Sequence, residues 1–221
     1  MHLTKDKKID PYWVNEFKDI PKTLDLPADL PRPEFRRYES HRIDYQINPH
    51  VIKATQTMAS KNRKSFYQYL LTAFDVLLYK LTNNDDFVVG ISSAAQSAAG
   101  LKNLVGHLVN LLPIRANISK DMSYKELLDQ IKTKMLDAFD HQNSTYGQIL
   151  NALSIERDPS RIPLVNIIFN VDQQYAGQGL EFKSIKAEYE SNPRHYENFE
   201  IFINATTLAD KCVLECQYNI H

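Results

Sequence analysis

The chain has 221 residues, of which 43% are hydrophobic and 24% charged, and its formal net charge at pH 7 is −1. This length is sufficient to bury a core, and the balanced charge excludes the basic excess that proteins use to neutralise nucleic-acid phosphates. No run approaches the ~18 apolar residues of a membrane span, and no apolar segment follows the charged N-terminus as in a secretory signal. We therefore expect a cytoplasmic protein that binds neither nucleic acid nor membrane.

Residues 1–37 are predicted to form a linker that contains one short helix. Prolines recur through the segment 10–38 and surround the aromatic pair Tyr12 and Trp13. Proline fixes its own φ and biases the preceding residue towards extended backbone. The linker is therefore expected to lie along the surface of the body formed by residues 38–221.

Capping signals predict four further helices. Asn48-Pro49 combines a capping side chain with proline at the first helical position, and Ser65 and Ser123 are each followed three residues later by Gln or Glu. Ser144 or Thr145 can cap a shorter helix. The predicted helices cover residues 49–59, 66–81, 124–141 and 146–153. Their inner stripes include Val51, Ile52, Met58 and Ala59 in the first helix and Leu71, Phe74, Leu77, Leu78 and Leu81 in the second.

Short apolar or alternating runs predict the strands. They cover residues 38–47, 87–91, 104–118, 163–171, 180–189, 199–207 and 212–220, with an AGQG turn at 176–179. This order of elements predicts an α+β domain, in which a mixed β-sheet has its helices packed on one face. Cys212 and Cys216 would lie on one face of the last strand, too far apart for a disulfide, and two thiols alone make a poor zinc site.

The strand at 163–171 is the one around which the other elements are expected to be organised. It follows a charged, proline-containing turn at 157–161 and is rich in β-branched residues, which favours a central position in the sheet. Asn166 and Asn170 lie four residues apart, so both side chains should leave one face. A polar face on a buried strand indicates a channel wall or a subunit seam.

Small side chains dominate the segment 92–102, SSAAQSAAGLK. Small residues allow close approach of backbone, either to another chain segment or to a bound thioester arm. Ser92 and Ser93, at its start, are therefore candidates for contact with a substrate.

Three stretches resemble ordered motifs of one family. LVGHLVNLLPIR (104–115), DHQNSTYGQIL (140–150) and RDPSRIPLVNIIFNVD (157–172) are similar to motifs in the C-terminal half of nonribosomal peptide synthetase condensation domains. The resemblance extends from residue 11 to 220. The variant VGHLVNLLPIR, preceded by AAQS, looks closest to condensation domains of hybrid polyketide and peptide assembly lines.

This resemblance implies a chloramphenicol-acetyltransferase-like fold of two lobes with a reaction tunnel between them. Family members join an upstream carrier-bound acyl or peptidyl thioester to the amine of a downstream carrier-bound aminoacyl group. Their catalytic motif of two adjacent histidines belongs to the N-terminal lobe, and none of the seven histidines here has a histidine neighbour. The chain therefore resembles a C-terminal lobe that stops before the family's final helix and is expected to be inactive alone.

The resemblance also implies the partners of this chain. They are the N-terminal lobe of the same domain, upstream and downstream carrier proteins and an adjacent adenylation domain. The lobe itself is expected to hold no cofactor and no metal, because 4'-phosphopantetheine arrives on the carrier proteins.

No residue of the chain is assigned a catalytic role, but two groups of residues carry structural or substrate expectations. Amide formation needs a held amine, a proton acceptor and stabilisation of an oxyanion. Asn110 matches the family's asparagine and could bond substrate or fix a loop, whereas His107 is more readily a satisfied, half-buried histidine than a base. The substrate-channel candidates are Ser92, Ser93, His107, Asn110, Asn166 and Asn170.

The residues expected to act structurally lie in the linker and the motifs. Arg115 should pair within the lobe, and Arg157, Asp158 and Arg161 should form one ion network that clamps their turn. His141 should complement the end of the preceding helix. The full set is Tyr12, Trp13, Arg115, His141, Arg157, Asp158 and Arg161.

Two other function classes remain open. One is a self-sufficient acyltransferase of the same fold, in which a histidine and an aspartate distant in sequence do the chemistry. The other is a noncatalytic condensation-like module that docks carrier proteins or tailoring enzymes.

Overall fold

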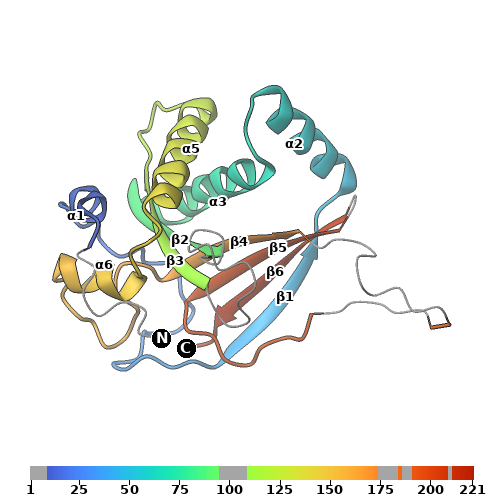
Figure 1. The fold of residues 1–221 in the computed structure, drawn as a ribbon. Helices are drawn as coiled ribbons and strands as arrows, with labels where there is room; N and C mark the ends of the chain where they lie inside the picture. The colour runs from blue at the N-terminus through green and yellow to red at the C-terminus, as the bar shows by residue number, and fades with distance from the viewer. Residues whose placement is uncertain (1–8, 95–108, 174–183, 186–190, 209–210) are drawn as a thin grey trace.

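The computed structural model describes residues 9–94, 109–173, 184–185, 191–208 and 211–221. Within these residues one mixed sheet has the strand order β1-β6-β5-β4-β2-β3 (Figure 1). Pairing is antiparallel except that β4 runs parallel to both of its neighbours. The strands are β1 (Ser40–Gln46), β2 (Asp86–Ala94), β3 (Val109–Asn117), β4 (Ile167–Gln173), β5 (Ile201–Leu208) and β6 (Lys211–Asn219).

The strand expected to be central is central. β4 lies between β5 and β2, but it begins at Ile167 and not at Pro163. Leu164 has φ of 66°, a left-handed conformation that an extended strand does not contain. The predicted strand at 180–189 and the turn at 176–179 lie outside the described residues, apart from 184–185.

The helices are α1 (Pro11–Glu16), α2 (Pro49–Lys61), α3 (Phe66–Thr82), α5 (Tyr124–Asp140) and α6 (Tyr146–Leu153). Figure 1 shows α2, α3 and α5 over one face of the sheet, with α1 and α6 near its β3 end. The predicted capping boxes are present at Ser65, Ser123 and Thr145, and the Asn48 side chain accepts from the His50 amide. The α+β architecture with helices on one face is thus confirmed.

The two faces of the sheet follow from its register. Phe169 stacks on Phe74 of α3 with ring centroids 5.1 Å apart, so its row faces the helices. That row continues through Ile203 and Cys216 to Ile43. We call this face the helix side and the opposite face of β4, β5, β6 and β1 the distal side.

Burial on the helix side decreases across the sheet. Phe169 is 3% exposed, Ile203 and Cys216 are half-buried, and Ile43 at the β1 edge is 60% exposed. The predicted inner stripes are correspondingly wrong in part: Ile52 and Ala59 of α2 are buried, but Val51, Met58, Leu77 and Leu81 are half exposed or more. For Val51 and Met58 the reason is that α2 lies over the rim of the sheet (Figure 1), where less of its surface meets a partner.

The linker is more deeply packed than the sequence suggested. Trp13, Phe17 and Leu24 are at most 1% exposed and belong to the hydrophobic core together with α3, α5 and the central strands. The expectation of a segment lying along the surface is therefore wrong for these three side chains. Proline-rich backbone can run outside a core while its apolar side chains enter it, since side-chain burial provides most of the stabilisation.

Candidate functional site

Two of the predicted channel residues meet at the loop between α5 and α6. The Asn110 Nδ2 donates to the carbonyls of Gln142 and Ser144, at 3.0 and 2.9 Å, and its Oδ1 accepts from the amides of Leu111 and Tyr146. The Ser93 Oγ donates to Oε1 of Gln142 at 2.5 Å. All hydrogen-bonding positions of the Asn110 amide are used, which favours the loop-fixing role over contact with a substrate.

The same loop holds the linker. Trp13 Nε1 donates to the carbonyl of His141 at 2.9 Å, the Tyr12 ring stacks on the His141 imidazole at 4.4 Å, and Nδ1 of His141 lies 2.7 Å from Oδ2 of Asp10. The imidazole beside Asp10 lowers the pKa of that carboxyl. His141 is the C-cap of α5, so it lies at the helix end where the sequence placed it.

Asn166 is a second linker contact. It is 1% exposed, and its Nδ2 donates to the carbonyl of Leu24 at 2.8 Å. An amide buried in this way is satisfied by the linker backbone, so the asparagine at this position is explained by the packing of residues 20–30.

Asn170 belongs to a chain of polar contacts that crosses four strands on the distal side. Its Nδ2 donates to Oδ1 of Asn204 at 2.9 Å, and the Asn204 Nδ2 donates to Oε2 of Glu215 at 3.1 Å. Glu215 lies 3.6 Å from Arg42, whose guanidinium makes two hydrogen bonds, of 2.6 and 2.7 Å, to Asp44. We call Asn170, Asn204, Glu215, Arg42 and Asp44 the polar ladder.

The charges in the polar ladder are fixed by their neighbours. The hydrogen bonds with Asp44 raise the pKa of the Arg42 guanidinium and lower the pKa of the Asp44 carboxyl. The ladder therefore combines the Arg42–Asp44 ion pair with Glu215 and two amides, and the Glu215 and Arg42 side chains are only 15% and 13% exposed. Such an array can hold and orient polar groups, but it contains no histidine to accept a proton.

The signal for the ladder was present in the sequence but incomplete. Asn170 was identified from its spacing, whereas Asn204, Glu215 and Arg42 were missed. Polar residues alternate with apolar ones in 203–206 and 214–218, which predicts one polar face for these parts of the two strands. Which strands are neighbours, and in what register, is not visible in that pattern.

The remaining channel candidates are less informative. Ser92 pairs with Leu111 across β2 and β3 and is half-buried, one residue along from Ser93 and therefore on the other face. His107 and the small-residue segment from Ala95 onward lie outside the described residues.

The structural motif residues are confirmed in one case and corrected in another. Arg115 pairs with Asp86 through two hydrogen bonds of 2.8 and 2.6 Å, as expected. The turn is different: Arg161 pairs with Asp25 of the linker at 2.8 Å and lies 3.3 Å from Asp158. Among the described ion pairs none contains Arg157, so the predicted network is wrong for Arg157. The predicted pair of Asp158 with Arg161 is present, and Arg161 also ties the turn to the linker.

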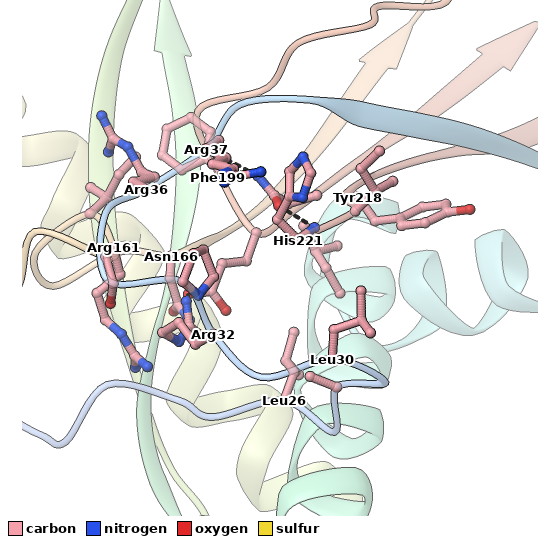
Figure 2. A pocket seen from close by; sticks show the side chains of 18 of the residues that line it. Leu26, Leu30, Arg32, Arg36, Arg37, Arg161, Asn166, Phe199, Tyr218 and His221 are labelled. Atoms are coloured by element: carbon pink, nitrogen blue, oxygen red, sulfur yellow. Dashed lines mark hydrogen bonds and ion pairs between the residues drawn. The ribbon is translucent and has the colours of Figure 1, made fainter.

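A cavity of about 620 Å³ lies between the linker and the ends of β5 and β6 (Figure 2). Its apolar wall includes Leu26, Leu30 and Tyr218, and arginines line it from the linker and the turn. Arg32 pairs with Glu200 at 2.8 Å and Arg161 with Asp25, so both cations are already compensated. The lining suits an apolar segment better than a reacting polar group.

A family comparison decides what kind of chain this is. The family model described as "Condensation domain" matches residues 3–221. The chain belongs to the condensation domain family. This confirms the family to which the three motifs pointed.

The curated relatives of this condensation domain chain are far longer than it is. It is 29% identical over 215 residues to surfactin synthase subunit 2 of Bacillus subtilis (strain 168), matching 97% of the chain but 6% of that protein. It is 30% identical over 200 residues to tyrocidine synthase 3 of Brevibacillus parabrevis, matching 90% of the chain and 3% of that protein. The chain thus spans a small part of each relative.

Solved structures of the same fold agree. A four-domain nonribosomal peptide synthetase bound to AMP and glycine matches 98% of this condensation domain chain and 18% of that protein, with a TM-score of 0.85 and 21% identity. The condensation domain of the Monacolin K polyketide synthase matches 96% of the chain and 52% of that domain, with a TM-score of 0.77 and 21% identity. These likenesses confirm the chloramphenicol-acetyltransferase-like fold.

None of the described helices is long and apolar enough to cross a membrane. In the same part of the chain, no three His, Cys, Asp or Glu side chains are grouped to hold a metal ion.

Proposed function

We propose that this chain is the C-terminal lobe of a condensation domain that forms amide bonds in nonribosomal peptide synthesis. In this proposal it supplies one wall of the tunnel in which a carrier-bound acyl or peptidyl donor meets a carrier-bound aminoacyl acceptor. The paired histidines that handle the amine's proton come from an N-terminal lobe. The domain works beside an adenylation domain, and 4'-phosphopantetheine enters the tunnel on the carrier proteins.

The observation that carries this proposal is the polar ladder on the distal side. It gathers three charged and two amide side chains from four strands on a face that α2, α3 and α5 do not cover, with no histidine among them. Ordering long side chains costs conformational entropy, and here the hydrogen bonds between the ladder residues already offset that cost, so the array is held in place before any substrate arrives. A wall that orients substrate while the other lobe supplies the base fits this arrangement.

The decisive experiment is reconstitution with an N-terminal lobe that carries two adjacent histidines. The chain alone, the lobe alone and the mixture are each supplied with donor-loaded and acceptor-loaded carrier proteins. Amide product is expected only from the mixture. Turnover by the chain alone would instead support a self-sufficient acyltransferase.

A matched pair of variants tests the role of the distal side. Asn204→Leu removes the central amide of the ladder and is expected to lower the rate in the mixture at least tenfold. Asn151→Leu changes an exposed asparagine on α6 and is expected to leave the rate unchanged. Equal rates for the two variants would show that the ladder does not line the tunnel.

The docking alternative has one observation in its favour. The X-domain from teicoplanin biosynthesis has the same fold, with a TM-score of 0.79 over 94% of this chain at 17% identity, in a complex with OxyB. One outcome would favour this alternative: the mixture forms no amide, but the immobilised chain retains a carrier protein or a tailoring enzyme on a column. The chain would then be better explained as a noncatalytic docking module. The hybrid polyketide and peptide context remains a prediction, which the genes flanking the chain would test.

A further inference from the structure

The two edges of the sheet differ in how their backbone groups are occupied. At the β3 edge the Ile118 amide bonds inward to Asp85, so the groups of Asn117, Pro113 and Leu111 point outward. The Gln130 side chain bonds both the amide and the carbonyl of Asn117, Pro113 has no amide hydrogen, and the Leu111 amide bonds the Asn110 side chain. Arg115 also points outward and its backbone groups have no partner among the described residues, so this edge is occupied or without a donor at Asn117, Pro113 and Leu111 but not at Arg115.

The β1 edge is open over its second half. The amide of Ile47 bonds inward to Cys212, and the carbonyl of Glu39 accepts from Ile220, so odd-numbered residues of β1 face β6. The even-numbered residues therefore point outward, and the Ser40 amide does so, bonding to His195. Among the described residues nothing pairs with the outward backbone groups of Arg42 and Asp44.

The same edge exposes apolar side chains in a row. Ile43 is 60% and Tyr45 67% exposed on the helix side. The row of Ile43 passes through Cys216 and is buried at Phe169 of β4, and the row of Tyr45 passes through Leu214 and is buried at Ala205 of β5; both rows become exposed towards β1. A second strand placed beside β1 would extend these rows and bury both side chains.

The charges on β1 select one partner and one register. An antiparallel copy of β1 that bonds through even-numbered residues can have its two-fold axis at Arg42, Ile43, Asp44 or Tyr45. An axis at Tyr45 would place Asp44 opposite Gln46 and form no opposite-charge pair. An axis at Arg42 or at Asp44 would place like charges opposite each other, which is unfavourable. Only the axis at Ile43 places Arg42 of each strand opposite Asp44 of the other.

We propose that β1 is a self-complementary edge through which two copies of this chain pair, antiparallel and centred on Ile43. Arg42 and Asp44 exchange backbone hydrogen bonds with their counterparts in the second copy, and their side chains pair across the two-fold axis on the distal side. Ile43 meets its own counterpart on the helix side, and Tyr45 meets His41. The result is one continuous sheet shared by two copies.

A cysteine on the axis tests the register. Ile43→Cys is made together with Cys216→Ser, because Cys216 is the partner of Ile43 in β6. Residues opposite each other in a non-hydrogen-bonded pair have Cα atoms ~4.5 Å apart, which a disulfide can span. Mild oxidation is expected to give a covalent dimer, whereas Val51→Cys, equally exposed at 54% but on α2, gives none. Equal cross-linking of the two variants would overturn the register.

Charge variants test the partner independently. Arg42→Asp and Asp44→Arg each place like charges opposite each other in a homodimer, so each variant is expected to sediment as a monomer at concentrations where the unmodified chain is a dimer. Mixed together they restore both opposite-charge pairs and should form a heterodimer. A wild-type chain that stays monomeric throughout a concentration series overturns the proposal, as does a mixture that stays monomeric although each variant unfolds cooperatively.

Discussion

The indole of Trp13 donates a hydrogen bond of 2.9 Å to the carbonyl of His141, a residue 128 positions later in the chain. This contact fixes the linker helix to the loop between α5 and α6, which Asn110 and Ser93 hold from the sheet. The linker is consequently part of the hydrophobic core of the described domain.

The first prediction concerns this anchor. Trp13→Ala removes a fully buried ring and should lower the free energy of unfolding by about 3–5 kcal/mol, whereas Trp13→Phe, which keeps most of the ring, should lower it by ~1–3 kcal/mol. Chemical denaturation followed by circular dichroism measures both. Val14→Ala, at a 39% exposed neighbour, is the control. Similar losses for Trp13→Ala and Val14→Ala would show that the linker does not contribute to the core.

A second prediction concerns Asp75 on α3. It is 1% exposed, neither carboxyl oxygen has a hydrogen-bond partner among the described residues, and burial raises its pKa well above the usual value. The unfolded chain loses this proton at lower pH than the folded chain does. The Asp75 contribution to the free energy of unfolding should therefore decrease as pH rises above the unfolded pKa of ~4, by up to ~1.4 kcal/mol per pH unit, until the folded group also ionises.

The variant that tests this is Asp75→Asn, which is a close isostere of the protonated carboxyl. It should be more stable than the wild type at pH 7 and should lose the part of the pH dependence above pH 4 that Asp75 causes. Denaturation curves at several pH values give the comparison, with the exposed Asp121→Asn as the matched control. Parallel stability curves for wild type and Asp75→Asn would contradict a protonated Asp75.

The third prediction is that alanine substitution of two glycines changes the free energy of unfolding in opposite directions. A Cβ at Gly90 in β2 would lie 2.6 Å from Cγ1 of Val165 and 2.8 Å from Cδ1 of Leu111, whereas at Gly147 in α6 nothing lies within 4 Å. Gly90→Ala should lower the free energy of unfolding by ~1–3 kcal/mol through overpacking, and Gly147→Ala should raise it by up to ~1 kcal/mol through helix propensity. Thermal melts of both variants check the signs. A neutral Gly90→Ala would mean that the sheet yields at this point.

The fourth prediction follows from the corrected turn. Asp158 bonds the amide and hydroxyl of Ser160, at 2.8 and 2.6 Å, and is half exposed, while Arg161 has a second partner in Asp25. Asp158→Ala should therefore lower the free energy of unfolding by only about 1 kcal/mol. Asp158→Asn can still accept hydrogen bonds from Ser160, so this variant should retain most of the free energy of unfolding that Asp158→Ala loses. Urea titrations distinguish the two variants. A loss of several kcal/mol in the free energy of unfolding for both Asp158→Ala and Asp158→Asn would support the three-residue ion network.

Local chemistry made the helices predictable. Ser65, Ser123 and Thr145 cap helices where the sequence placed them, because each box is completed by a residue three positions later. The start of β4 was misplaced because Leu164 adopts a positive φ that no local signal indicates. The inner stripe of α2 was half wrong because periodicity gives the apolar face but not how much of it a partner covers.

The sequence by itself determined the family, the α+β class, the helix starts and the central strand, since these depend on motifs and on interactions within a few residues. Only the tertiary structure shows that the side-chain amide of Asn110 is hydrogen-bonded to the loop between α5 and α6 and that of Asn166 to the linker backbone. It also shows that Asn170 joins Asn204 and Glu215 in one hydrogen-bonded chain. Within the described residues it further decides that the β3 edge is occupied or without a donor at three positions, whereas the β1 edge is open over its second half. The physical reason is that these properties depend on strand order and register, which bring together residues far apart in the chain. The pattern of residues along one strand does not indicate which strand pairs with it or in what register.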